Sequence, residues 1–308
     1  MRSGKRPARA VALLMLLGSP SLVAEPLPAV HQQRYCMGTM FDIVAYHSPS
    51  AEAERAIVKA MEEILRLDQV LSHFKSDSDL SRLVREGRGR FVRVDPRLFE
   101  VIQESLALSR RSNGKFDVTI APLLKAWKRA QADGHRLSAA DISEARRCVG
   151  YEKIQVEPPD RIRLASDCLE IDLGGIGKGY AVDRAMAVLK SAGIRHALVN
   201  AGGSSIAAIG APPDRTGWPV SLGARVAGRE TLLLSETSIS TAQQRSTPFV
   251  FDSGSFGEIL DPQTGAPTTN RMAVRVVAPT ATVSDALDTT LVMLSIEEGV
   301  KLLAHYPD

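Results

Sequence analysis

The hydrophobic and polar positions of this chain follow two different periods. Segment 51–72 repeats apolar residues every three or four positions, which predicts an amphipathic α-helix. The same spacing predicts helices over 96–113, ended by Gly114, and over 179–193, ended by Gly193. Alternation of apolar and polar residues predicts strands. The segments with that pattern are 34–47, 153–165 as a hairpin, 196–210 as a strand, glycine turn and strand, and the first part of 272–294, which continues as a helix.

The order of these elements indicates the fold class. Strands and helices mix without the regular βαβ alternation of a doubly wound parallel sheet, which favours an α+β fold. Two further segments are expected as strands that run into loops, "CLEIDLGG" at 168–175 and the start of "EILDPQTGAP" at 258–267. With 308 residues, of which 44% are hydrophobic, the chain can bury a sizeable core. We predict one mixed α/β domain over residues 25–308, because no linker divides this part.

Residues 1–24 have the organisation of a secretory signal peptide. A head with four basic residues precedes the apolar run "VALLMLLG", and small residues surround Ala24. The apolar run is too short to span a bilayer as a helix, and the alternative is a retained anchor. We expect residues 1–24 to be removed and the protein to be exported to the periplasm, with inner-membrane association only through an uncleaved signal.

Removal of the signal peptide changes the charge of the chain. The formal net charge of +3 becomes −1, because residues 1–24 hold four basic and no acidic residues. The remaining chain has no basic field of the kind that binds nucleic acid. We therefore expect no nucleic-acid partner.

The chain has three cysteines, and an odd number leaves at least one thiol outside any disulfide within the chain. Cys148 and Cys168 flank the predicted hairpin, and an exported protein could oxidise them to a disulfide. The alternative is that both are buried free thiols, a common state of this residue. No Cys or His cluster has the spacing of a zinc site.

The stretch "DLGGIGKGYAVD", residues 172–183, concentrates glycines around Lys178. It does not match the G-x-G-x-x-G fingerprint, and it lacks the Ser or Thr that follows the lysine of a P-loop. Backbone amides at the start of the predicted helix favour an anion, and Lys178 adds a point charge suited to phosphate. Asp172, at the end of an apolar run, lies where a carboxylate commonly meets a ligand. We predict a phosphate-binding loop rather than a helix entry that happens to be rich in glycine.

A second candidate site lies in "TVSDALDT", residues 282–289. Asp285 and Thr289 are four positions apart, so both fall on one face of the predicted helix and offer oxygen ligands to magnesium. The alternative is a capping box in which Thr282 is the N-cap residue and Asp285 stands three positions further on. From this helix alone, the capping interpretation is favoured.

Two shorter motifs are compatible with ordinary turns when each is taken alone. "GKFDVTIAPLLKAW", residues 114–127, places Phe116 and Asp117 before an apolar helix that begins at Pro122. An aromatic ring beside a carboxylate suits a flat ligand with hydrogen-bonding edges. "EILDPQTGAP", residues 258–267, ends in a turn rich in Asp, Pro and Gly.

Together and in this order, these motifs resemble the FAD:protein FMN transferases, the ApbE family of flavin transferases. The similarity runs from "MGTMF" at 37–41 to "LVMLS" at 291–295, which is nearly the whole chain after the signal peptide. Its landmarks are "MGT", "LSHFKSDSDLSRL", "GKFDVT", "DLGGIGKGYAVD", "LVNAGG", "ILDPQTG" and "APTATVSDALDT". The resemblance implies the α+β catalytic domain of this family in a divergent member.

The resemblance also implies an activity and a set of site residues. Such enzymes split FAD at its pyrophosphate with a divalent metal and attach the FMN half to a Thr or Ser of a partner flavoprotein, here expected in a membrane redox complex, releasing AMP. By similarity, Lys178 assists catalysis. Asp285, Thr289 and the carbonyl of Gly175 would hold Mg²⁺, which reverses the preference for the capping interpretation. The residues expected to line the FAD site are Met37, Phe74, Lys115, Phe116, Asp117, Asp172, Lys178 and Leu260.

The chain departs from the family pattern at three places in its C-terminal half. They are Glu258, where the family usually has a histidine, Ser204-Ser205 after a glycine pair, where an acidic residue is usual, and Ala242-Gln243 after Thr241, where Ser-Gly is usual. None of the six histidines lies near the first of these places in sequence. We expect Glu258 to act as the catalytic base. The alternatives are an FAD-binding relative with weak or no transfer activity, serving as flavin donor or maturation factor, and an FAD pyrophosphatase that yields FMN and AMP.

Overall fold

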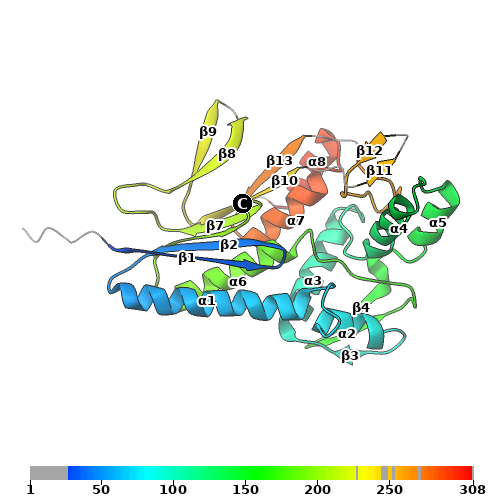
Figure 1. The fold of residues 1–308 in the computed structure, drawn as a ribbon, viewed down its shortest axis with the longest axis horizontal. Coiled ribbons are helices and arrows are strands. Elements are labelled where there is room, and N and C mark those ends of the chain that lie inside the picture. The colour runs from blue at the N-terminus through cyan, green and yellow to red at the C-terminus, as the bar shows by residue number, and fades with distance from the viewer. Residues whose placement is uncertain (1–26, 227, 244–248, 252–253, 269–271, 307–308) are drawn as a thin grey trace, which may run out of the picture.

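A six-stranded antiparallel sheet, in the order β1-β2-β6-β7-β10-β13, forms the centre of the molecule (Figure 1). This architecture confirms the predicted α+β class. The computed structural model describes residues 27–226, 228–243, 249–251, 254–268 and 272–306.

The elements were numbered in chain order. They are β1 (Ala29–Cys36), β2 (Thr39–Tyr46), α1 (Ser50–Leu71), α2 (Asp79–Glu86), β3 (Val92–Arg93), α3 (Pro96–Arg111), α4 (Ala121–Ala132), α5 (Ala139–Arg146), the 3₁₀ helix η1 (Tyr151–Lys153), β4 (Ile154–Glu157), β5 (Arg161–Leu164), α6 (Gly177–Ser191), β6 (His196–Ala201), β7 (Ser205–Ile209), β8 (Trp218–Val226), β9 (Arg229–Leu234), β10 (Thr237–Gln243), β11 (Phe249–Phe251), β12 (Gly254–Phe256), β13 (Ala273–Ala278), α7 (Ala281–Leu291) and α8 (Ile296–Leu303).

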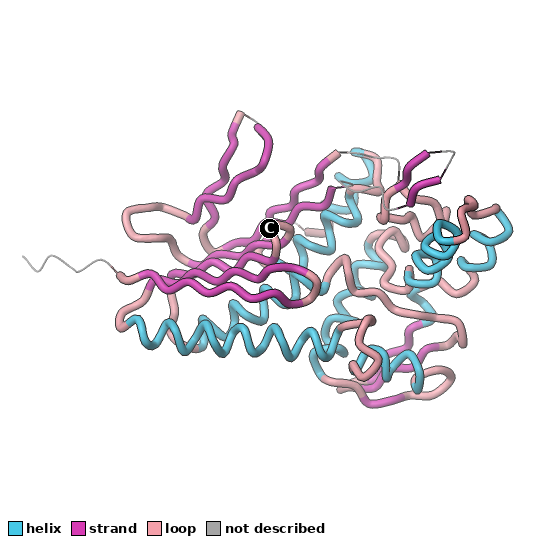
Figure 2. Tube along the Cα trace, in the orientation of Figure 1, coloured by secondary structure: helices cyan, strands magenta, loops and turns pink. Residues whose placement is uncertain are grey.

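Helices α1, α6 and α7 cover one face of the central sheet (Figure 2). Alternate residues of β2 point to this face, and Phe41, Ile43 and Ala45 are fully buried there. The apolar stripe of α1 packs against the same core, with Ile57 and Leu67 among its buried residues. The two periods of the sequence therefore meet in one hydrophobic layer between sheet and helices.

The hairpin of β8 and β9 covers part of the opposite face. Trp218 of β8 and Leu234 of β9 form a second small core with Ile206, Ala208 and Ile239 of the central sheet. Strand β7 is buried along its whole length because its neighbouring residues face different cores. The part of the sheet that contains β7 and β10 is thus packed between two layers, and this part carries the candidate site.

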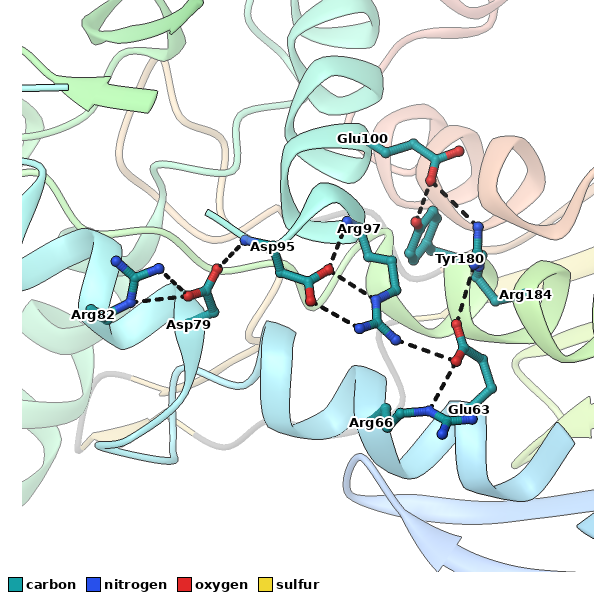
Figure 3. Close-up of polar contacts among 9 residues, drawn as sticks. All are labelled: Glu63, Arg66, Asp79, Arg82, Asp95, Arg97, Glu100, Tyr180 and Arg184. Atoms are coloured by element: carbon teal, nitrogen blue, oxygen red, sulfur yellow. Dashed lines mark hydrogen bonds and ion pairs between the residues drawn. The ribbon is translucent and has the colours of Figure 1, made fainter. Parts of the chain in front are cut away.

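A network of charged side chains joins α1, α3 and α6 beside the main core (Figure 3). Glu63 of α1 is buried and accepts hydrogen bonds from Arg66, Arg97 and Arg184, with distances of 3.2, 3.3 and 3.3 Å. Asp95, the N-cap of α3, accepts hydrogen bonds from the backbone N–H and the guanidinium of Arg97. The Arg97 side chain lowers the pKa of Asp95 from its ordinary value of 3.8.

The predicted elements with a clear period are confirmed. Segments 51–72, 96–113 and 179–193 form α1, α3 and α6, the pattern over 153–165 forms the hairpin β4–β5, and 196–210 forms β6 and β7. The strand and helix predicted over 272–294 are β13 and α7.

Three predicted strands are wrong in detail. Segment 34–47 is two strands rather than one, because Met37 and Gly38 turn the chain with φ values of 49° and 74°. Segment 168–175 belongs to no sheet, although Leu169 and Ile171 are buried. The stretch at 258–267 makes only an isolated bridge between Leu260 and Pro267. Segments 168–175 and 258–267 have an apolar pattern, but such a pattern becomes a strand only where a neighbouring strand pairs with it.

Candidate functional site

A cavity of about 530 Å³ opens where the glycine loop meets α4 and α7. Most residues that the sequence motifs single out line this cavity, although they are far apart in the chain. They are Phe74, Lys115, Phe116, Asp117, Asp172, Gly175, Lys178, Glu258, Leu260, Asp285 and Thr289. Met37 does not line the cavity and lies at the β1–β2 turn, where its methyl group approaches Gly177 at the start of α6.

The glycine loop is folded by contacts with its own carboxylate and with α7. The N–H of Gly174 donates a 2.7 Å hydrogen bond to Oδ1 of Asp172, and Nζ of Lys178 donates to the carbonyl of Gly174 at 3.2 Å. Gly175 packs so closely on α7 that an added Cβ would lie 3.2 Å from Cγ2 of Thr289. The loop therefore holds its backbone, the Lys178 ammonium and the first turn of α6 beside the cavity, which is an arrangement suited to an anion.

Asp285 is a buried carboxylate at the junction of three elements. Its Oδ2 accepts a 2.9 Å hydrogen bond from the N–H of Gly179 in α6, and its Oδ1 accepts one of 3.0 Å from the Ser205 hydroxyl in β7. The capping interpretation is wrong, because the N-cap of α7 is Thr280. Asp183 of α6 instead binds the first turn of this helix, accepting hydrogen bonds from the backbone N–H groups of Ala281 and Thr282.

Asp288 is a second buried carboxylate on the same helix, and it is not among the site residues predicted from the motifs. It lines the cavity with Asp285 and Thr289, and the Thr289 hydroxyl donates a 3.1 Å hydrogen bond to its Oδ1. Burial, with the neighbouring charge of Asp285, holds the pKa of Asp288 well above its ordinary value of 3.8. The signal was present in the sequence, since Asp288 stands three positions after Asp285 and so shares its helix face.

The "GKFDVT" motif forms the side of the cavity next to α4. Both oxygens of Asp117 are engaged by its own surroundings: Oδ1 by the N–H and hydroxyl of Thr119, and Oδ2 by the N–H of Tyr151. Burial raises the pKa of Asp117 above its ordinary value, although these hydrogen bonds oppose the shift. Lys115 forms an ion pair of 2.8 Å with Asp261 of the "ILDPQTG" motif, so the two motifs are joined directly.

An aromatic pair stands at another part of the cavity wall. The rings of His73 and Phe74 lie 3.8 Å apart between their centroids, and Phe74 is 82% exposed. Nδ1 of His73 is 4.0 Å from Oδ1 of Asp172. His73 lies far in the chain from the "ILDPQTG" motif, and only the fold brings it to the same cavity as Glu258.

All three places where the chain departs from the family pattern are represented on the cavity wall. Ser204, Thr241, Ala242, Gln243 and Glu258 all line it, and Glu258 is exposed. The departures therefore cluster in space as well as in the C-terminal half of the sequence. They alter the surroundings of the cavity without removing the glycine loop or the oxygen groups of α7.

A disulfide joins Cys148 to Cys168, and the open question from the sequence is resolved in favour of the bridge. Cys36 is a free, buried thiol. The bridge connects the segment before the glycine loop to the segment whose Tyr151 N–H holds Asp117. It thus ties together two parts of the chain that support the cavity.

Comparisons with known proteins agree with this fold. The chain is 28% identical over 279 residues to a protein of Klebsiella pneumoniae (strain 342) named FAD:protein FMN transferase, covering 87% of this chain and 79% of that protein. A Vibrio cholerae protein of the same name is 27% identical over 301 residues, covering 94% and 88%. The crystal structure of Pseudomonas stutzeri flavinyl transferase ApbE, in its apo form, is similar with a TM-score of 0.79 and 29% identity, covering 92% of this chain and 89% of that chain.

The family itself is shown by a match along most of the chain. The sequence model of the ApbE family matches residues 37–308. This chain therefore belongs to the ApbE family.

Proposed function

We propose that this chain is a Mg²⁺-dependent FAD:protein FMN transferase, which moves the FMN half of FAD to a Thr or Ser hydroxyl of a partner flavoprotein and releases AMP. The observation that carries the proposal is the single cavity lined by the glycine loop, the "GKFDVT" and "ILDPQTG" motifs and the polar face of α7. Its volume of about 530 Å³ lies in the range of cofactor sites. Relatives of this chain are named FAD:protein FMN transferase.

The polar groups of α7 fit a divalent cation. Asp285 and Thr289 offer hard oxygen atoms, and the close packing of Gly175 on Thr289 brings a loop carbonyl to the same region. Magnesium commonly completes such an incomplete set of protein ligands with water and substrate phosphate, and it would supply neutralisation of the charge that develops on the pyrophosphate. Among the described residues, no group of three or more His, Cys, Asp or Glu side chains is placed to hold a metal, so any site here would use mixed oxygen ligands.

The remaining residues have roles in binding and proton transfer. The acceptor oxygen forms a bond to the phosphorus of the FMN half, the bond from that phosphorus to the bridging oxygen breaks, and AMP leaves with the bridging oxygen. Lys178 stands at the loop to counter phosphate charge, and the ring of Phe116 is buried beside Gly175. Glu258, exposed on the cavity wall, accepts the proton that the hydroxyl loses.

We further propose that the protein works outside the cytoplasm, as the basic and apolar segment at 1–24 indicates. The acceptor would be an exported flavoprotein of a membrane redox complex. In the part of the chain that the structure describes, no helix has the length and apolar character needed to cross a membrane.

The test is incubation of the full chain with FAD, Mg²⁺ and an exported flavoprotein encoded in the same genome. Fluorescent flavin that stays on the acceptor in a denaturing gel, with one AMP released per flavin attached, supports the transferase. Bound FAD without transfer or AMP would identify a flavin-binding relative. Free FMN and AMP formed without an acceptor would identify a pyrophosphatase.

A further inference from the structure

We propose that Asp288 is a positioning residue of the divalent-cation site, supplying a second buried negative charge and holding the Thr289 hydroxyl in the orientation that leaves its lone pairs available to the cation. The inference rests on the proposed function, because it takes the face of α7 that carries Asp285 and Thr289 as the cation site. Neither the family resemblance nor the comparisons assign Asp288 a role.

The first support is an excess of buried negative charge. Asp285 is 3% exposed and Asp288 is 2% exposed, and the two stand three positions apart on one helix. Within the described ranges, neither carboxylate has a Lys, Arg or His nitrogen within the 4.0 Å of an ion pair, although the charge of Lys178 acts on Asp288 from further away. Unpaired buried charges are costly, and they are normally paired, protonated or bound to a metal. A cation in the cavity would neutralise both.

The second support is the difference between the hydrogen bonds of the two carboxylates. Asp285 receives good donors from Gly179 and Ser205. The hydroxyl of Ser240 lies near both carboxylates, 3.4 Å from Asp285 Oδ1, but its one proton is directed to the carbonyl of Ser204 at 2.7 Å. Asp288 has the Thr289 hydroxyl as a donor at 3.1 Å, and Ser240 can donate to it only while its proton is turned away from Ser204.

The hydrogen bond between Thr289 and Asp288 fixes the direction of one proton. A threonine hydroxyl has a single proton and two lone pairs. Because the proton points to Oδ1 of Asp288 at 3.1 Å, the lone pairs of Thr289 remain free. Residues that orient metal ligands in this way typically change metal affinity by about 10–100-fold when they are replaced.

Asp183 of α6 is an example of a carboxylate with a purely structural role at the first turn of α7. It is bound by the N–H groups of Ala281 and Thr282 and by the Thr282 hydroxyl, so it closes the first turn of α7. It lines a different cavity, on the side of α3 and α6. The hydrogen bonds of Asp183 offset the cost of removing its carboxylate from water, whereas the hydrogen bonds of Asp288 do not.

The test measures Mn²⁺ binding to the full chain by electron paramagnetic resonance, with Mn²⁺ as the probe for the divalent cation. Asp288→Asn keeps the volume and an acceptor for Thr289 but removes the charge, and Asp288→Ser is the second variant if the first does not fold. We expect the affinity of the variant for Mn²⁺ to be lower than that of the wild type by about tenfold or more. We also expect metal-free FAD to bind more tightly than to the wild type, because one negative charge facing the pyrophosphate is gone. The factor by which Mn²⁺ strengthens FAD binding should fall in the same variant.

Asp183→Asn is the matched control, because it neutralises a partly buried carboxylate of α6 that binds the first turn of α7 outside this cavity. It should lower thermal stability while leaving Mn²⁺ and FAD affinities unchanged. Wild-type affinities in Asp288→Asn would overturn the inference, as would an equal loss of Mn²⁺ affinity in Asp183→Asn. Failure of the wild type to transfer FMN, with the Mn²⁺ results as expected, would count against the proposed function alone.

Discussion

The backbone N–H of Gly179 in α6 donates a 2.9 Å hydrogen bond to Oδ2 of Asp285 in α7. This contact spans 106 positions of sequence. It is possible only because residue 179 has no side chain: a Cβ would lie 2.1 Å from the carbonyl oxygen of Ala281 and 2.7 Å from Cβ of Asp285. The helix that follows the glycine loop and the helix that carries Asp285 are therefore locked together where they border the cavity.

Replacement of Gly179 by alanine should destabilise the protein by about 1–3 kcal/mol or more, because the new methyl group collides with backbone atoms that cannot rotate away. Chemical denaturation at neutral pH measures the change. Gly177→Ala is the matched control two positions earlier, where the nearest neighbour of an added Cβ would be 3.7 Å away. Equal stability of the two variants would contradict the close packing of α6 on α7.

Asp285→Asn should abolish metal-dependent release of AMP while preserving the volume of the side chain. The variant loses the charge that the cation needs, and its amide group cannot accept hydrogen bonds on both sides as the carboxylate does. AMP release from FAD with and without Mg²⁺ provides the measurement, and circular dichroism checks the fold. Metal-dependent turnover at the wild-type rate would remove Asp285 from the cation site.

Glu258→Gln should slow FMN transfer by about 10²- to 10⁴-fold, the usual effect of losing a general base. FAD affinity should stay unchanged, because the role proposed for the exposed Glu258 side chain is proton transfer rather than FAD binding. The rate of acceptor labelling and the dissociation constant of FAD are measured separately. His73→Gln is the informative companion, since His73 lines the same cavity. A fully active Glu258→Gln beside an inactive His73→Gln would assign the base to His73.

Asp95→Ala should lower the free energy of unfolding by about 0.5–2 kcal/mol at neutral pH, because α3 loses its N-cap. The pKa of Asp95 is lowered in the folded state by Arg97, so the carboxylate stabilises the fold above its ordinary value of 3.8. That contribution is lost as the pH falls through the lowered pKa. Urea denaturation of both proteins at neutral and acidic pH checks this. A difference that persists undiminished at the lowest pH would show that the ionised carboxylate is not responsible.

The fold class and the long helices could be predicted from the sequence because their signal is local. The stripe of α1 and the glycine that follows α6 can be recognised without any partner. The segment 168–175 could not be assigned correctly, because its backbone hydrogen bond to a distant part of the chain, from the N–H of Asp172 to the carbonyl of Val118, does not join it to a neighbouring strand. Short helices such as α2, α5 and α8 gave no period long enough to be assigned.

The candidate site was predictable where a motif has a distinctive order of residues, as in the glycine loop and the face of α7. The hydrogen-bonding state of each residue was not. Asp117 looks like a free ligand in sequence, yet its oxygens are engaged by Thr119 and Tyr151. Asp288 looks like one more polar residue of a helix, yet it is buried beside Asp285. Burial and partners depend on elements that are distant in sequence.

The sequence by itself determined the α+β class, the main periodic elements, the family resemblance and most of the residues that line the cavity. Each of these is a matter of composition, spacing and order along the chain. Tertiary structure alone decided that Cys148 pairs with Cys168, that His73 and Glu258 share a cavity, and that two carboxylates of α7 are buried without an ion pair among the described residues. The physical reason is that hydrogen-bond partners and desolvation come from segments brought together by packing, and a local pattern contains no information about them.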